Sequence, residues 1–95
     1  MAAYVITDID VSDPVRYEDY KALSGSSAAR YGGKFLVRGG PHQTLEGDWQ
    51  PHRVVVLEFP SAEQAREWWS SPEYEEAKAI RRAASESRII LVEGI

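Results

Sequence analysis

The stretch RVVVLEFPSAEQAREWWSSPEY, residues 53–74, decides the fold, because it holds the clearest strand-to-helix transition in the chain. The apolar run from Arg53 to Phe59 is typical of a buried strand. Ser61 and Gln64 form a capping box, which predicts the start of a helix. Ser70-Ser71-Pro72 then ends this helix and predicts the start of another, with serine as the cap and proline first.

The flanking sequence supplies the remaining elements. Asp13 and Pro14 predict the start of a first helix, and Gly32-Gly33 predicts its end. Gly25-Ser26-Ser27 weakens the second half of this helix, because an interior glycine costs about 1 kcal/mol relative to alanine. Runs of β-branched and apolar residues predict three further strands, at 4–11, 34–38 and 88–93.

The resulting β-α-β-β-α-β order predicts a ferredoxin-like α+β sandwich, formed by a single domain over residues 1–95. Right-handed crossovers place both helical regions on one face of a four-stranded antiparallel sheet. The strand residues of the other face are half apolar, and an exposed face of that kind usually marks an interface or a ligand site. We therefore expect a homodimer that forms through these sheet faces.

Composition excludes several classes of function. The chain has 95 residues, no cysteine and a net charge of −4, which excludes thiolate sites and disulfides and argues against a nucleic-acid partner. No apolar run approaches the length of a membrane span, and the N-terminus lacks the basic region of a signal peptide, so we expect a soluble cytoplasmic protein. His42 and His52 flank a polar loop without ligand-like spacing, so we predict no metal.

Strand alternation places three charged residues, Asp8, Glu58 and Arg88, on the half-apolar face. We take the first and third strands to be parallel central neighbours, which puts Asp8 and Glu58 at the same end. The last strand runs antiparallel beside the first and brings Arg88 close to Asp8. Two nearby carboxylates can share acid–base work, so Asp8 and Glu58 are the candidate catalytic residues. The alternative is an ion pair that only fixes a dimer interface.

Further residues are candidates for substrate binding. Arg38 and Arg88 would hold a carboxylate or enolate oxygen. Trp49 lies in a polar loop, where it covers a pocket, reaches a partner subunit or pins the loop onto its own sheet. Trp68 and Trp69 cannot both face the core, because neighbouring helix residues point about 100° apart. The substrate-binding candidates are Tyr4, Arg38, Trp49, Trp68, Tyr74 and Arg88.

Taken together, several motifs resemble the uncharacterised bacterial family named domain of unknown function 1330. They span the chain and are Ala3-Tyr4-Val5-Ile6, the stretch 31–40 (YGGKFLVRGG), Glu46-Gly47-Asp48-Trp49, Glu58-Phe59-Pro60-Ser61, Trp69-Ser70-Ser71-Pro72-Glu73-Tyr74, Arg81-Arg82 and Ser87-Arg88. The resemblance implies a dimeric α+β barrel, in which two sheets pack their bare faces together. It also implies kinship of fold with cofactor-independent monooxygenases, muconolactone isomerases and haem-dependent chlorite dismutases. The haem enzymes need an axial histidine, and neither His42 nor His52 is predicted within a helix or strand, so no haem or other cofactor is expected.

Three functions stay open. The first is a cofactor-free enzyme, either an acid–base catalyst or a monooxygenase-like one, acting on a small aromatic or acidic metabolite. The second is a module that binds a metabolite without chemistry. The third is a structural dimer whose charges only fix the pairing. The sequence has no G-x-S-x-G elbow and no glycine-rich phosphate loop, which argues against a serine hydrolase and a nucleotide-binding protein.

Overall fold

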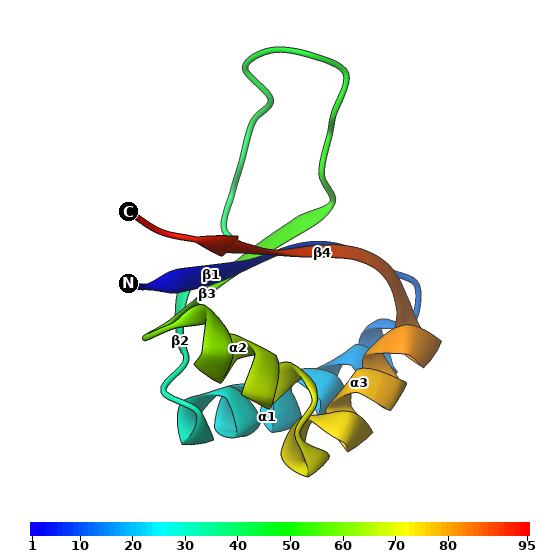
Figure 1. Cartoon of the computed structure of the whole chain (residues 1–95). Helices are drawn as coiled ribbons and strands as arrows, with labels where there is room; N and C mark the ends of the chain where they lie inside the picture. The colour runs from blue at the N-terminus through cyan, green and yellow to red at the C-terminus, as the bar shows by residue number, and fades with distance from the viewer.

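The computed structural model describes residues 1–95 and has the predicted element order. Four strands form one sheet in the order β2-β3-β1-β4, in which every neighbouring pair is antiparallel. All three helices cover the same face of this sheet (Figure 1), so the predicted ferredoxin-like fold is confirmed. The elements are β1 (Ala3–Val11), α1 (Pro14–Arg30), β2 (Lys34–Arg38), β3 (Arg53–Phe59), α2 (Ala62–Trp69), α3 (Pro72–Ala84) and β4 (Ser85–Glu93).

The helices begin where their capping residues predict. The side chains of Asp13, Ser61 and Ser71 each accept a hydrogen bond from the backbone amide three residues later, at 3.2 Å. These bonds satisfy amides that the first helical turn leaves without a partner. None of the helices is both long and apolar enough to cross a membrane.

Helix α1 runs unbroken through Gly25-Ser26-Ser27, where the sequence predicted a weakness. The segment packs against the rest of the protein, because Ser24 and Ser27 are buried and the side chains of Phe35 and Arg38 lie beside Gly25. A Cβ at Gly25 would already sit 3.7 Å from the Phe35 ring. Tertiary contact thus offsets the low helix propensity of this segment.

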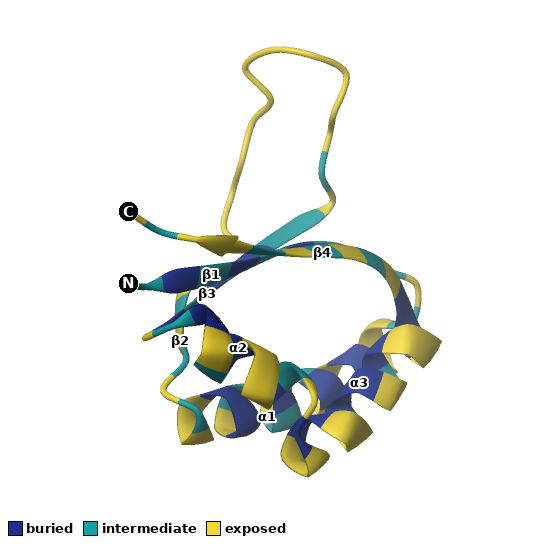
Figure 2. Cartoon of the chain, in the orientation of Figure 1, coloured by how far each residue is buried: buried dark blue, intermediate teal, exposed yellow.

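The core lies between the sheet and the helices (Figure 2). Burial alternates along β1 and β3, as expected for strands with one covered face. The largest fully buried side chains are Phe59, Trp68, Tyr74 and Ile9. The tryptophan that faces the core is therefore Trp68, while Trp69 is half-buried.

A β-bulge in β2 changes the faces that simple alternation predicts. Phe35 pairs with Leu57, but Val37 pairs with Val56, so the register shifts by one residue between them. An extra residue in one strand reverses the facing of everything after it. Simple alternation along the strand would place Arg38 with Leu36 on the half-apolar face, but after the bulge Arg38 pairs with the buried Val55 and points to the helix side of the sheet.

The long loop between β2 and β3 projects from the sheet on the side away from the helices (Figure 1). Its residues are exposed almost throughout. Its base is held by His42 Nε2 and Pro51 O, 2.7 Å apart, and Thr44 Oγ1 donates to Trp49 O at 2.7 Å. The loop therefore stands over the open face of the sheet, which no other part of the chain covers.

Candidate functional site

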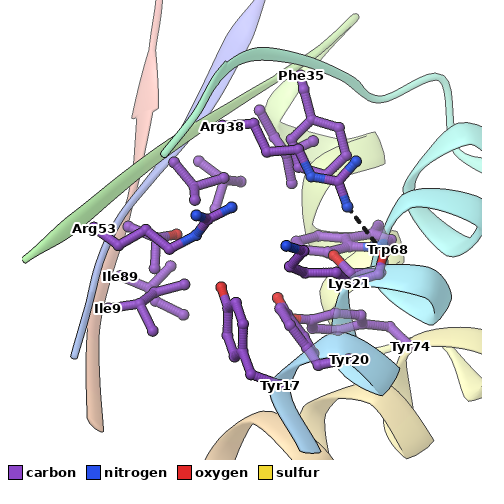
Figure 3. Close-up of a pocket in the computed structure, with 15 residues that line it drawn as sticks. Ile9, Tyr17, Tyr20, Lys21, Phe35, Arg38, Arg53, Trp68, Tyr74 and Ile89 are labelled. Atoms are coloured by element: carbon purple, nitrogen blue, oxygen red, sulfur yellow. Dashed lines mark hydrogen bonds between the residues drawn. The ribbon is translucent and has the colours of Figure 1, made fainter. Parts of the chain in front are cut away.

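An aromatic pocket lies between the helix-covered face of the sheet and α1 (Figure 3). Tyr17 and Tyr20 reach it from α1, Trp68 from α2 and Tyr74 from α3. The enclosed cavity has a volume of about 20 Å³, which is room for about one water molecule. We call this the inner pocket, and its lining residues are Val5, Thr7, Ile9, Tyr17, Tyr20, Lys21, Ser24, Phe35, Arg38, Arg53, Val55, Leu57, Trp68, Tyr74 and Ile89.

Two arginines from neighbouring strands border the inner pocket. Figure 3 shows Arg53 and Arg38 extending toward the helix side, where Tyr17, Tyr20 and Trp68 lie. Arg38 Nη2 donates to Lys21 O at 2.9 Å, and its Cζ lies 4.1 Å from the centre of the Phe35 ring. Arg53 Cζ lies 5.6 Å from the centre of the Tyr17 ring, and its buried Nε has no hydrogen-bond partner.

Neither Arg38 nor Arg53 forms an ion pair with a carboxylate. None of the 15 residues that line the pocket is acidic or a histidine. Two guanidinium groups thus face an aromatic cavity with no carboxylate in ion-pair contact, in a chain whose net charge is −4. Such a site favours a bound anion, because guanidinium groups hold carboxylates and related oxygens by charge-assisted hydrogen bonds.

Gly39 leaves the space in which the Arg53 guanidinium group lies. The φ of Gly39 is +73°, and a Cβ built on it would overlap the Arg53 guanidinium group. The Gly39 amide also donates to Val54 O at 2.8 Å, which ties the end of β2 to β3. The glycine therefore supplies both a left-handed backbone and the space that the arginine occupies.

Buried hydroxyl groups complete the floor of the inner pocket. The hydroxyl oxygens of Tyr20 and Tyr74 lie 2.9 Å apart, and Trp68 Nε1 donates to Ser27 Oγ at 3.1 Å. Burial is the main cause that raises the pKa of Tyr20 well above its ordinary value, and the nearby Tyr74 adds to the effect. Burial also raises the pKa of Tyr17. The pocket therefore offers positive charge and neutral hydroxyl donors, and it contains no carboxylate or imidazole to act as a general base.

The predicted cluster of Asp8, Glu58 and Arg88 forms only in part. Asp8 pairs with Arg88 across β1 and β4, as expected, but Glu58 pairs with Tyr4 at the other end of β1. Placing Asp8 beside Glu58 was wrong because β1 and β3 are antiparallel. The crossover through α1 makes β2 run in the same direction as β1. The chain then turns back, so β3 runs opposite to both. Glu58 instead forms an ion pair with Lys34, at 3.2 Å.

Asp8 anchors the long loop on the open face. Its Oδ1 accepts from the His52 amide at 2.9 Å, and its Oδ2 accepts from Trp49 Nε1 at 3.2 Å. Burial alone would raise the pKa of Asp8, but these two bonds and the charges of His52 and Arg88 hold it below its ordinary value. Trp49 thus pins the loop onto its own sheet, which is one of the roles that the sequence left open.

The open face also carries a polar groove of about 520 Å³ beside the loop. Asp8, Asp10 and Glu86 line it together with His52, whose Nε2 lies 3.7 Å from Asp10 Oδ2. No three histidine, cysteine, aspartate or glutamate side chains are grouped so that they could hold a metal ion. The groove is therefore acidic and open, with no geometry suited to a particular ligand.

The family model described as Domain of unknown function (DUF1330) matches residues 2–95. The chain belongs to this family. A protein of unknown function from Rhodopseudomonas palustris, RPA0582, has a similar structure, with 26% identity, a TM-score of 0.80, and coverage of 99% of this chain and 82% of that one. No curated protein matches the chain.

More distant structures share the fold of this DUF1330 protein. SnoaB from Streptomyces nogalater, a cofactor-independent oxygenase, has 19% identity, a TM-score of 0.72 and coverage of 99% of this chain and 93% of that one. A dimeric ferredoxin-like protein of unknown function from Jannaschia sp. CCS1 has 13% identity, a TM-score of 0.73 and coverage of 99% and 100%. At these identities the likeness concerns the fold alone.

The predicted binding residues of the DUF1330 chain separate into two groups. Three of them line the inner pocket, namely Arg38, Trp68 and Tyr74. The others lie on or over the open face, namely Tyr4, Trp49 and Arg88, together with the catalytic candidates Asp8 and Glu58. The candidates therefore do not form one site.

Sequence reasoning missed three residues of the inner pocket: Tyr17, Tyr20 and Arg53. A signal for Arg53 was present, because it lies two residues before Val55 and so shares the helix-facing side of β3. An arginine in an otherwise apolar set of strand positions is a functional signal. Tyr17 and Tyr20 are three residues apart, which places both phenols on one face of the helix.

Proposed function

We propose that this DUF1330 protein is a small-molecule enzyme that binds a planar organic anion in the inner pocket and stabilises its enolate or phenolate form without a cofactor. The observation that carries this proposal is the pair Arg38 and Arg53, which border an aromatic cavity and have no acidic partner. Aromatic walls suit a planar ring, and guanidinium groups suit its anionic oxygens.

The chemistry follows from the charges in the pocket. A substrate that ionises to an enolate or phenolate gains the most from fixed positive groups in a site shielded from water. The Tyr20 hydroxyl is protonated at neutral pH, because the ordinary pKa of tyrosine is about 10 and burial raises the pKa of Tyr20 further. When Tyr74 donates the bond between the two phenols, the Tyr20 O–H is free to donate to the same oxygen. The substrate itself must be acidic, because the pocket supplies no carboxylate or imidazole to remove a proton.

Ligand binding requires the pocket to widen, because a cavity of about 20 Å³ holds about one water. Arg38 is the side chain best suited to move. It is exposed at the end of β2, and its only hydrogen bond is the one to the Lys21 carbonyl. An incoming carboxylate is a stronger acceptor than this carbonyl, so it would draw the guanidinium group away.

The fold supports the enzymatic reading by analogy, since SnoaB is a cofactor-independent oxygenase with the same architecture. The absence of a base in the pocket favours a second candidate, a module that binds such an anion without turnover. Oxygen consumption during incubation with an ionisable hydroxyaromatic acid separates the two. Uptake above the protein-free rate supports the enzyme, and saturable binding without uptake supports the binding module.

The test of the site uses 1-hydroxy-2-naphthoate, titrated while tryptophan fluorescence is recorded, because Trp68 lines the pocket. Arg53→Gln and Arg38→Gln should each weaken binding about tenfold, as expected for loss of a charge-assisted hydrogen bond. The matched control is Arg16→Gln, which removes an exposed arginine of α1 outside the pocket. Equal affinities in all three variants would refute the site.

We also propose that two copies pair through the open sheet face. Leu36, Val37, Ile90 and Val92 leave 39–57% of their surface exposed there, which is unusual for a strand surface in a monomer. A solved structure of the same fold belongs to a dimeric ferredoxin-like protein. Pairing would bury these side chains and enclose the loop that carries Trp49.

A further inference from the structure

A second potential binding surface follows the outer edge of β4, on the helix side of the sheet. Two adjoining cavities of about 340 Å³ and about 290 Å³ share Trp69 and Ile89 as lining residues. We call them together the edge groove. From its make-up we infer that the edge groove binds a small amphiphilic acid, with its apolar body at one end and its carboxylate at the other.

The apolar end has the size and character of a ligand site. Seven of its nine lining residues are hydrophobic, and its volume of about 340 Å³ falls within the usual range of about 300–1,000 Å³ for small-molecule sites. Ala65 and Trp68 of α2 form one wall, and Leu91 of β4 forms the other. Val5, Trp68 and Ile89 also line the inner pocket, so these three side chains lie between the two sites.

The other end of the edge groove is basic. Arg81 and Arg82 of α3 line it together with Ser85 and Ser87 of β4. Neither arginine forms an ion pair, and the neighbouring Glu86 lines the groove on the open face instead. The edge groove therefore joins an apolar cavity to an uncompensated cationic one.

Arg81 gives the strongest indication of a missing anion. It is only 4% exposed, its Nε has no hydrogen-bond partner, and its Nη1 is bonded to Ser87 Oγ. Cations are favourable in the last turn of a helix, where Arg81 and Arg82 lie, but that effect does not require burial. A buried guanidinium group without a counterion is costly, and a bound carboxylate would offset that cost.

Trp69 joins the two ends of the edge groove. It lines both cavities, with Arg81 Cζ 5.7 Å from the centre of its ring. A chain that lies across the indole can place its apolar part against Leu91 and its carboxylate between Arg81 and Arg82, which line the same cavity. These contacts match a medium-chain fatty acid or an arylalkanoic acid. They do not suit a neutral molecule, which would leave the arginines unpaired.

The test is a titration of the full chain with decanoate, followed by amide and indole NMR shifts. Saturable shifts should centre on Trp69, Arg82 and Ser87, and Arg82→Gln should weaken decanoate binding about tenfold. Decanol, the neutral match, should bind Arg82→Gln and the unchanged protein equally. Arg16→Gln is the control, because it removes an exposed arginine that does not line the groove.

The NMR shifts that decanoate causes in the unchanged protein test the inference even if the Arg82→Gln variant folds poorly. Shifts confined to the inner pocket or to the open face, or no saturable shift, would overturn the inference. An equal loss of decanoate and decanol binding in Arg82→Gln would also overturn it, because the carboxylate would then have no part. Since the probe and the variant differ from those of the inner pocket, and the indole NMR signals report Trp69 separately from Trp68, this result is independent of the proposed function.

Discussion

Tyr20 and Tyr74 meet beneath the inner pocket, where their hydroxyl oxygens lie 2.9 Å apart in a buried hydrogen bond. The bond joins α1 to α3, and the two rings pack edge to face with centres 6.4 Å apart. One phenol thus donates to the other in a region from which water is largely excluded. A buried hydroxyl without a partner is costly, so the protein with both tyrosines should be more stable than a variant that keeps only one of them.

A double-mutant cycle measures this coupling. Tyr20→Phe or Tyr74→Phe alone should lower the free energy of unfolding by about 1–3 kcal/mol, because each leaves the other hydroxyl without its phenol partner. The double variant should be less destabilised than the sum of the two by about 1 kcal/mol. Urea unfolding gives all four values, and strictly additive losses would contradict a direct bond between the phenols.

Alkaline pH should destabilise the fold through the same pair. Burial raises the pKa of Tyr20 above its ordinary value, so the folded protein holds the proton more tightly than the unfolded chain. The contribution of this residue to stability is fully present below about pH 10, the ordinary pKa of tyrosine, and declines as the pH rises from there toward the folded pKa.

The measurement compares urea midpoints at about pH 8 and about pH 11, values on either side of the ordinary tyrosine pKa. The unchanged protein should lose more stability over this interval than Tyr20→Phe, which cannot ionise at this position. A matched loss in both proteins would mean that other groups cause the alkaline effect and that Tyr20 is not strongly shifted.

The sequence predicted most of the fold because its signals are local. Asp13, Ser61 and Ser71 mark helix starts by their own hydrogen bonds, and a helix start needs no knowledge of distant residues. Burial along β1 and β3 follows strict alternation. The predicted element order was therefore confirmed.

The candidate site was predicted less well because it depends on relations between strands. Asp8 and Glu58 share a face, but the antiparallel pairing of β1 with β3 puts them at opposite ends. The bulge after Phe35 moves Arg38 to the helix side, and nothing in the sequence marks the extra residue. Arg53 was detectable from its position relative to Val55, yet its strand was interpreted only as apolar core.

Dimerisation through the open face predicts a clear effect of Ile90→Glu. Ile90 is 57% exposed in the single chain, so a glutamate there leaves the fold of the protomer intact. In a dimer the same carboxylate would be buried against apolar side chains, at a cost of several kcal/mol. Sedimentation at micromolar concentration should show a dimer for the unchanged protein and a monomer for the variant.

Val15→Glu is the matched control, because Val15 is 81% exposed on α1, away from the sheet. This variant carries the same new charge and should remain dimeric. A monomer for the unchanged protein would reject the interface. A dimer for Ile90→Glu would place the contact elsewhere on the molecule.

Gly39→Ala should remove the proposed anion site while the fold persists. The φ of Gly39 is +73°, where a residue with a side chain is strained by about 1–3 kcal/mol. The new methyl group would also occupy the space of the Arg53 guanidinium group. Arg53 must then leave its position beside Tyr17, so the affinity for 1-hydroxy-2-naphthoate should fall as it does in Arg53→Gln.

Gly40→Ala separates this steric effect from a general effect on the loop. A Cβ at Gly40 would meet no atom within 4 Å, so this neighbouring change should alter stability by less than about 0.5 kcal/mol and leave binding unchanged. The two alanines differ by one position in the chain, and only the one at 39 displaces an arginine. If both variants bind the naphthoate like the unchanged protein, Arg53 is not part of the binding site, and the proposed function loses its main support.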